Sequence, residues 1–183
     1  MFLELMEKIA QALDDRNIPY MVIGGQAVLI YGEFRATADI DITLGVAQGE
    51  FPRILEMAGA LGMRPMHPDP ESQVNAVMVF PVLDLDTGIR VEFIFSFSPY
   101  ERQAITRTVP RVVRKTPIHF ATAEDLVAMK VFSERPRDWE DARSIMLKNP
   151  DLDIKYILFW LKQFDDATEM HSVERFQSIR KSL

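Results

Sequence analysis

The chain has 183 residues, about the length of one domain or of a core with a small subdomain, and a formal net charge of −6. It contains no cysteine, which excludes disulfide scaffolds, thiolate zinc sites and iron–sulfur clusters. Its acidic balance argues against a general nucleic-acid coat protein. The sequence contains no stretch of about 18 apolar residues, so we expect no helix that spans a membrane. The acidic first residues are not those of a signal peptide. We therefore expect a cytoplasmic protein.

Apolar patterning divides the first 120 residues into helices and short strands. The expected helices cover 2–13, 26–31, 50–61 and 99–106. The expected strands cover 20–23, 38–44, 77–83, 89–95, 109–113 and 117–120. Three prolines between residues 63 and 73 predict a loop, and residues 84–88 have the composition of a hairpin turn.

The remaining residues are expected to be helical. Thr122 and Asp125 resemble a capping box and begin a helix that reaches about residue 134. Pro136 suits the first turn of a second helix. The last two expected helices cover 153–164 and 173–179. We therefore predict an α+β fold: a mixed sheet flanked by helices over residues 1–120, followed by a helical C-terminal subdomain, residues 121–183, packed on that core.

Two aspartates in an alternating strand are the first candidates for chemistry. Asp39 and Asp41 alternate with apolar residues, so their side chains share one face of the strand. Like charges there repel each other unless a cation lies between them, and hard oxygen ligands at fixed spacing suit Mg²⁺ or Mn²⁺. Acid-x-acid pairs are common by chance in so acidic a chain, and the alternative is the solvent-facing side of an edge strand.

A third carboxylate, Glu92, interrupts the apolar strand at 89–95. If this strand neighbours the one that carries Asp39 and Asp41, three carboxylates converge on one face of the sheet. The alternative is that Glu92 pairs with Arg90 or another cation in solvent, and spacing alone does not decide between the two.

The Gly24-Gly25 pair ends a buried strand and opens a helix. Such a turn can direct backbone N–H groups and a helix N-terminus at an anion. Most glycine pairs are ordinary turns, but this one directly precedes the aspartate strand. A phosphate cradle beside a divalent-metal site is what nucleotide chemistry requires.

In this order, the motifs resemble the nucleotidyltransferase superfamily related to DNA polymerase beta, and more closely the AbiEii toxin-like nucleotidyltransferases. The glycine pair is followed by Asp39-Ile40-Asp41 and by the strand carboxylate Glu92, and a helical Lys130 precedes an Arg/Asp cluster. The resemblance covers residues 17–147. The chain departs from it at one position, since the family usually has aspartate where this sequence has Glu92.

The resemblance implies a nucleotidyltransferase-type sheet and a metal-dependent transfer of a nucleoside monophosphate from ATP, GTP, CTP or UTP to an acceptor hydroxyl. Two Mg²⁺ or Mn²⁺ ions would be held by Asp39, Asp41 and Glu92, and Glu92 would be the general base. Because glutamate places its carboxylate one methylene further out, the alternative is a catalytically impaired module that binds nucleotide or a partner protein without turnover.

The resemblance also assigns residues to the nucleotide. The amides of Gly24 and Gly25 would hold the outer phosphates, and Lys130 would neutralise the triphosphate. The further residues that could support or contact substrate are Arg35, Thr37, Arg135, Arg137 and Asp138. The alternatives are a solvated Lys130 on an amphipathic helix and, for Asp138 and Asp141, ordinary pairing with nearby arginines at a helix start.

A basic stretch, Arg102–His119, contains no acidic residue. It could guide an RNA acceptor or nucleotide phosphates, and the alternative is the solvated face of a hairpin. Relatives transfer nucleotides to tRNA ends, proteins or small molecules, and some are toxins neutralised by an antitoxin protein. The sequence leaves the acceptor open.

Overall fold

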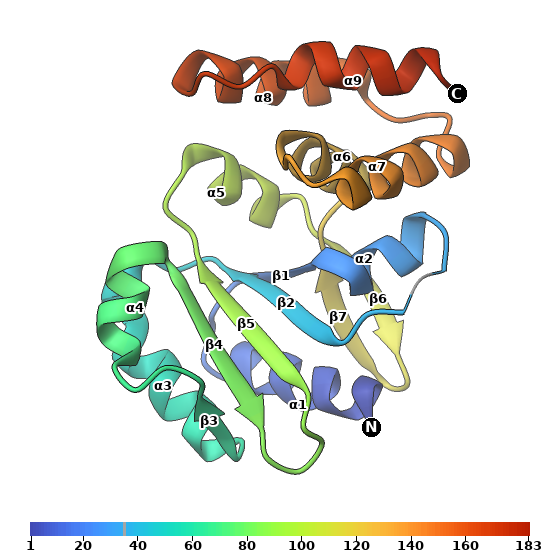
Figure 1. Ribbon diagram of the computed structural model, residues 1–183. Helices are drawn as coiled ribbons and strands as arrows, with labels where there is room; N and C mark the ends of the chain where they lie inside the picture. The colour runs from blue at the N-terminus through green and yellow to red at the C-terminus, as the bar shows by residue number, and fades with distance from the viewer. Residues whose placement is uncertain (35) are drawn as a thin grey trace. The chain divides into compact units, whose positions relative to one another are not determined.

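The computed structural model describes residues 1–34 and 36–183 of the chain. These residues form two units (Figure 1), the first comprising Met1–Gln26 and Ala36–Ala121 and the second Ala27–Arg35 and Thr122–Leu183. Helix α2, Gly24–Tyr31, begins in the first unit and continues in the second. None of the described helices is long and apolar enough to cross a membrane.

The first unit is built on one mixed sheet with the strand order β3-β4-β5-β2-β1-β7-β6. The strands are β1 Tyr20–Ile23, β2 Asp39–Leu44, β3 Met63–Pro65, β4 Val79–Asp84, β5 Arg90–Phe95, β6 Val109–Val113 and β7 Thr116–Phe120. Strand β2 runs parallel to β5 and β1 runs parallel to β7, whereas the other neighbours are antiparallel. The interior strands β5 and β2 therefore lie side by side with both amino ends at the same edge.

Short helices surround this sheet in the first unit. They are α1 Phe2–Asp14, the 3₁₀ turn η1 Gln48–Glu50, α3 Phe51–Ala60, α4 Pro70–Val77 and α5 Pro99–Thr106. Helix α1 packs against β7 with a buried apolar face, and α3 packs near β3. Phe80, Phe93 and Phe95 are fully buried, and the ring of Phe51 meets two of them edge-on. This aromatic cluster fixes α3 on the sheet through apolar burial.

The loop predicted over residues 63–73 is wrong. Met63–Pro65 forms the edge strand β3, and Pro70 begins helix α4. Proline is tolerated in the first helical turn, where its missing N–H has no partner to lose, and the Asp69 carboxylate accepts a hydrogen bond from the Ser72 N–H at 3.1 Å as the N-cap. The strand predicted from residue 77 consequently begins later, because α4 runs to Val77.

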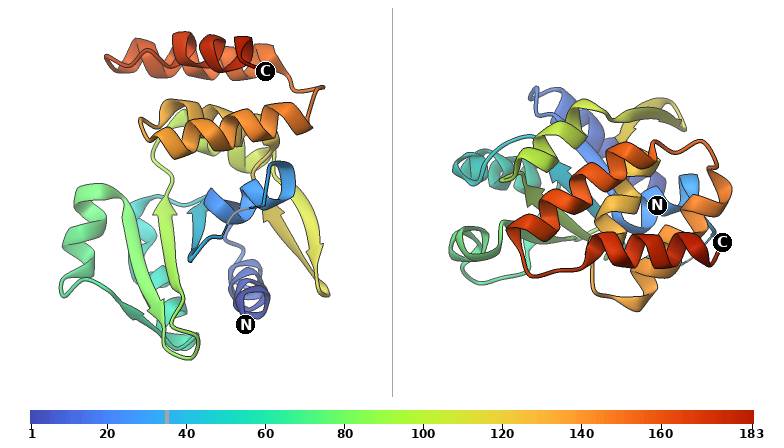
Figure 2. Two further views of the ribbon diagram at one scale, coloured as in Figure 1. Left: turned by 45° about the vertical axis from the view of Figure 1, so that its right-hand side comes forward. Right: turned by 90° about the horizontal axis from the view of Figure 1, so that it is seen from above.

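Four helices form most of the second unit: α6 Ala123–Phe132, α7 Pro136–Lys148, α8 Ile154–Ala167 and α9 Ser172–Lys181. Helices α6 and α7 make one layer and α8 and α9 a second (Figure 2). Thr122 caps α6 as predicted, its hydroxyl accepting from the Asp125 N–H at 3.1 Å. The buried Asp125 carboxylate accepts in turn from the Tyr156 hydroxyl at 2.5 Å, which ties α8 to the start of α6. The predicted α+β fold, with a helical C-terminal part, is confirmed.

Candidate active site

The aspartate strand β2 lies inside the sheet, between β1 and β5. In the parallel β2–β5 ladder Asp41 is the partner of Glu92, and Asp39 is the partner of Arg90. Partners in neighbouring strands point to the same side of a sheet, so the three carboxylates of Asp39, Asp41 and Glu92 share one face. The strand that carries Glu92 is thus the neighbour of the strand that carries Asp39 and Asp41, as the convergence of three carboxylates required. The alternative, that the aspartates lie on an edge strand, is wrong.

The glycine pair lies at the same end of this face. Ile23, the last residue of β1, is the partner of Asp41, and Gly24 follows it directly with a positive φ of 63°. A Cβ atom built on Gly24 would lie 1.8 Å from Oδ2 of Asp41. Glycine is therefore favoured here for two independent reasons: the left-handed backbone and the close approach of the Asp41 carboxylate.

The third carboxylate has a cationic partner. The Arg90 guanidinium donates to the Glu92 carboxylate in an ion pair, with 44% of the arginine side chain and 25% of the glutamate side chain exposed. The two residues are separated by one residue on β5, so strand alternation places both on the carboxylate face. The pairing of Glu92 with Arg90 that the sequence left open as the alternative is thus present.

The donor chemistry of this face fits a hard divalent cation, since two carboxylates share one strand and a third lies on its neighbour. As the side chains stand, however, residues 1–34 and 36–183 contain no group of three or more histidine, aspartate or glutamate side chains arranged as a metal site. Arg90 accounts for part of this difference, because it occupies the Glu92 carboxylate.

Two of the supporting residues belong to the segment before β2. The Thr37 hydroxyl donates to the backbone carbonyl of Asp39 at 3.4 Å, so it steadies the entry to the strand. Arg35 lies outside the described residues. Gly25 is buried in the first turn of α2.

Lys130 belongs to the second unit and is buried, with 7% of the residue exposed. Its ammonium lies 2.5 Å from a carboxylate oxygen of Asp138 and 3.0 Å from one of Asp141. The alternative of a solvated lysine is therefore wrong. Burying an ammonium is tolerated because two carboxylates surround it.

Asp138 is the centre of this second group. Its second oxygen accepts from the Ser133 hydroxyl at 2.6 Å and from Nε of Arg135 at 2.6 Å, so the pairing with an arginine that the sequence left open as the alternative is present. Burial pushes the pKa of Asp138 upward, but hydrogen bonds from Lys130 and Ser133 and the two positive charges outweigh it and hold the pKa below its ordinary value. Arg137 is exposed.

Ser133 is a contributor that the sequence did not indicate. It stands at the C-cap of α6, and no motif marks a lone serine there. Its role follows only from the turn between α6 and α7, which returns the chain so that its hydroxyl reaches Asp138.

The basic stretch is partly neutralised within the first unit. The Arg114 guanidinium lies 2.5 Å from a carboxylate oxygen of Glu4 and 3.1 Å from one of Glu7, both on α1. The backbone N–H of Lys115 donates to Glu7 as well. The turn of the β6–β7 hairpin is therefore tied to α1, which leaves less positive charge for an RNA acceptor than the sequence suggested.

Comparison with solved structures places the fold in a known class. ANT(2")-Ia in complex with adenylyl-2"-tobramycin has a TM-score of 0.60 at 19% identity, over 90% of this chain and 97% of that one. A nucleotidyltransferase-like protein from Paracoccidioides brasiliensis gives 0.58 at 16% identity, over 88% and 87% of the two chains. The lincosamide adenylyltransferase LnuA, lincomycin-bound, gives 0.53 at 12% identity, over 78% and 94%. At these identities the likeness is one of fold, and the fold is that of a nucleotidyltransferase.

The family follows from the sequence match. Residues 1–181 match the family described as a nucleotidyltransferase of unknown function, DUF6036. The chain belongs to this family. No curated protein sequence matches it.

Proposed function

We propose that the protein is a metal-dependent nucleotidyltransferase of the AbiEii-like type, which moves a nucleoside monophosphate from a nucleoside triphosphate to an acceptor hydroxyl. The observation that carries the proposal is the juxtaposition of Gly24, Asp41 and Glu92. Gly24 has a left-handed backbone and lies against one carboxylate, and that carboxylate is the sheet partner of the second.

In this proposal Asp39, Asp41 and Glu92 would hold two Mg²⁺ or Mn²⁺ ions. When bound, the ions would lower the pKa of the acceptor hydroxyl and offset the charge of the triphosphate. Glu92 would accept the proton of the acceptor hydroxyl. The acceptor oxygen then bonds to the α-phosphorus, the bond from that phosphorus to the bridging oxygen breaks, and pyrophosphate leaves.

The amides of Gly24 and Gly25 would donate to phosphate oxygens of the donor nucleotide, as helix N-termini do for anions. For Lys130 to bind the nucleotide, it must first leave one of its carboxylate partners, which the sequence did not indicate. Its ammonium is bound by Asp138 and Asp141, so contact with a triphosphate requires it to exchange a carboxylate for a phosphate oxygen. The remaining candidates would act by holding these groups in place: Thr37 at the start of β2, and Arg135 and Asp138 around Lys130.

We propose that the acceptor hydroxyl belongs to a small molecule rather than to RNA. The ties between the hairpin and α1 reduce the free charge that an RNA backbone needs. Two structural neighbours with this fold also bind small molecules, since one is in complex with adenylyl-2"-tobramycin and the other is lincomycin-bound. A role as a toxin, with an antitoxin partner, is a hypothesis that rests on the resemblance of motifs.

The test is a label-transfer assay with each α-labelled nucleoside triphosphate, Mg²⁺ or Mn²⁺, and a cell extract separated into small molecules, RNA and protein. We compare the wild type with Asp41→Asn and with Asp86→Asn, which changes an exposed aspartate of the β4–β5 turn by the same chemistry. The proposal expects label in one fraction for the wild type and Asp86→Asn, and none for Asp41→Asn. Transfer retained in Asp41→Asn would refute it.

A second candidate, nucleotide binding without turnover, is favoured by the ion pair that occupies Glu92. It expects saturable nucleotide binding by calorimetry in the wild type, no transfer in the assay above, and the appearance of transfer in Glu92→Asp. Turnover by the wild-type protein would eliminate it.

A further inference from the structure

The carboxylate face carries a positive charge of its own. Arg90 is the sheet partner of Asp39 and stands two residues before Glu92 on β5. Alternation therefore puts its side chain on the same face as all three carboxylates. The guanidinium is already engaged with one of them, Glu92.

We propose that Arg90 is an internal counter-cation of this site, which holds Glu92 when no divalent cation is present and competes with that cation for it. The inference rests on the proposed function, because it takes Asp39, Asp41 and Glu92 as the ligands. It assigns Arg90 as a positioning residue that sets how tightly the site takes up its ion.

The physical argument is one of charge balance. Three carboxylates on one face repel each other unless a cation lies among them, and the guanidinium supplies one positive charge where a divalent cation supplies two. Because 44% of the Arg90 side chain is exposed, it can swing into solvent without the cost of burying an unpaired charge. The pair is thus weak enough to open when a divalent ion arrives.

The geometry sets the size of the expected effect. Positions two apart on a strand are separated by roughly 6–7 Å. A unit charge at that distance from a divalent ion, in a water-like dielectric, changes the affinity by about tenfold. Removing the Arg90 charge should therefore tighten divalent-ion binding by about that factor, and by more if freeing Glu92 adds a ligand.

The experiment measures the apparent dissociation constant of Mn²⁺ alone, by the electron paramagnetic resonance signal of the free ion at low ionic strength, without nucleotide or acceptor. The variants are Arg90→Gln, which removes the charge, and Arg90→Lys, which keeps it. The matched control is Arg53→Gln. Arg53 is also 44% exposed and also paired with a glutamate, Glu50, but it lies on α3 and not on β5.

The expected result is Mn²⁺ binding about tenfold tighter in Arg90→Gln than in the wild type, with Arg90→Lys and Arg53→Gln close to the wild type. Equal affinity in Arg90→Gln and the wild type would overturn the inference. A gain of the same size in Arg53→Gln would also overturn it, since the effect would then be one of net charge.

A further variant separates this failure from failure of the proposed function. Asp41→Asn in the Arg90→Gln background should abolish the tight binding. Suppose that Asp41→Asn abolishes Mn²⁺ binding but Arg90→Gln alone binds Mn²⁺ no more tightly than the wild type. The carboxylate site is then supported and the proposed role of Arg90 is refuted. If Asp41→Asn leaves Mn²⁺ binding unchanged, the carboxylate site itself is refuted, and the inference with it. Far-UV circular dichroism of each variant confirms that the comparison is between folded proteins.

Discussion

The buried ion cluster of the second unit makes a sharp prediction about stability. Replacing Lys130 by methionine keeps the length of the side chain and removes its ammonium. Two buried carboxylates, at 2.5 and 3.0 Å in the wild type, then lose that cation. Removing one partner of a buried ion pair costs about 3–5 kcal/mol, because a charge is left without compensation in a poorly solvated place.

The structure places the expected cost of Lys130→Met near the lower end of that range, about 3 kcal/mol. Asp138 keeps its hydrogen bonds from Ser133 and Arg135, so one of the two carboxylates remains largely satisfied. Adding Asp141→Asn to Lys130→Met removes one of the two carboxylate charges that have lost the ammonium and should recover part of the loss, a coupling that a double-mutant cycle measures.

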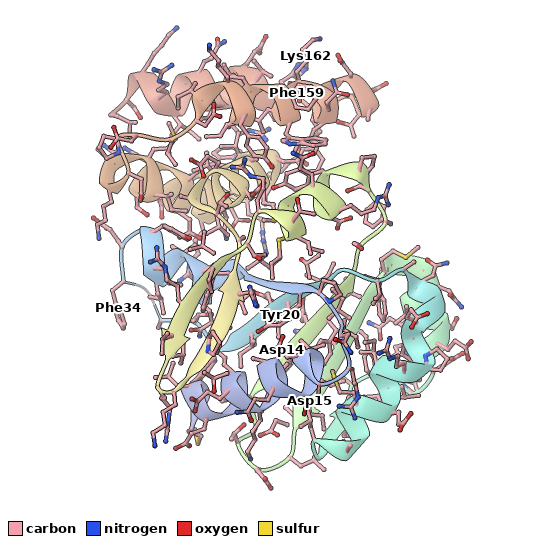
Figure 3. All side chains as sticks on the ribbon, turned by 180° about the vertical axis from the view of Figure 1, so that it is seen from behind. Asp14, Asp15, Tyr20, Phe34, Phe159 and Lys162 are labelled. Atoms are coloured by element: carbon pink, nitrogen blue, oxygen red, sulfur yellow. The ribbon has the colours of Figure 1, made fainter. Side chains whose placement is uncertain are left out.

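Urea unfolding followed by tryptophan fluorescence is the suitable assay, since Trp139 and Trp160 lie on α7 and α8 and both report on the second unit. The matched control is Lys162→Met. Lys162, labelled in Figure 3, pairs with Asp166 at 3.2 Å, but the two side chains are 69% and 58% exposed. This surface pair should be worth no more than about 0.5 kcal/mol. A loss in Lys130→Met no larger than in Lys162→Met would refute the reasoning.

Three other changes test the first unit and the acid response. Gly24→Ala should disturb the Asp41 carboxylate and, because of the positive φ, destabilise the protein by about 1–2 kcal/mol in urea unfolding. The control is Gly59→Ala on α3, where nothing lies within 4 Å of the Cβ position. This change should be neutral or stabilising in the same assay. Tyr20 and Asp14 are labelled in Figure 3. Burial, with a smaller contribution from the charge of Asp14, raises the pKa of Tyr20 from 10.0 to about 12. The folded protein thus disfavours the ionised ring, stability falls as the pH rises above 10.0, and Tyr20→Phe should reduce that fall in unfolding measured from pH 9 to about 12. The lowered pKa of Asp138 contributes stability above its ordinary value of 3.8 that is lost as the pH falls below it, so Asp138→Asn should flatten the acid limb of the same profile.

Local patterns of the sequence predicted the carboxylate face of the first unit and its glycine pair. The alternation around Asp39 and Asp41 is a property of any strand, and Gly24-Gly25 marks the end of β1 because few other residues allow the chain to turn there. Even the Arg90–Glu92 pair could be foreseen as an alternative, since both residues are on one strand. What the sequence could not decide was the neighbour of each strand, which depends on the order β5-β2-β1.

The surroundings of Lys130 in the second unit were harder to predict because they depend on helix packing. A lysine on a helix is solvated in most proteins, and that expectation failed for Lys130. One signal was present: α6 carries apolar residues on nearly every side, and most of its residues are buried. A helix that is apolar all round lies inside its unit, so a lysine on it needs carboxylate partners, here Asp138 and Asp141 from α7.

The glutamate at residue 92, where the motif pattern that the sequence resembles has aspartate, and the arginine two residues before it are best considered together. An aspartate at this position would hold its carboxylate close to the strand, one methylene short of the place where Glu92 meets the guanidinium. The glutamate side chain reaches along the strand to Arg90, and in the proposal made above it turns across the strand towards Asp41, its partner on β2. In that proposal Arg90 is the cation in the first of these positions and a divalent ion is the cation in the second. The proposal therefore gives the extra methylene of Glu92 a purpose, which is to let one carboxylate serve an internal and an external cation in turn.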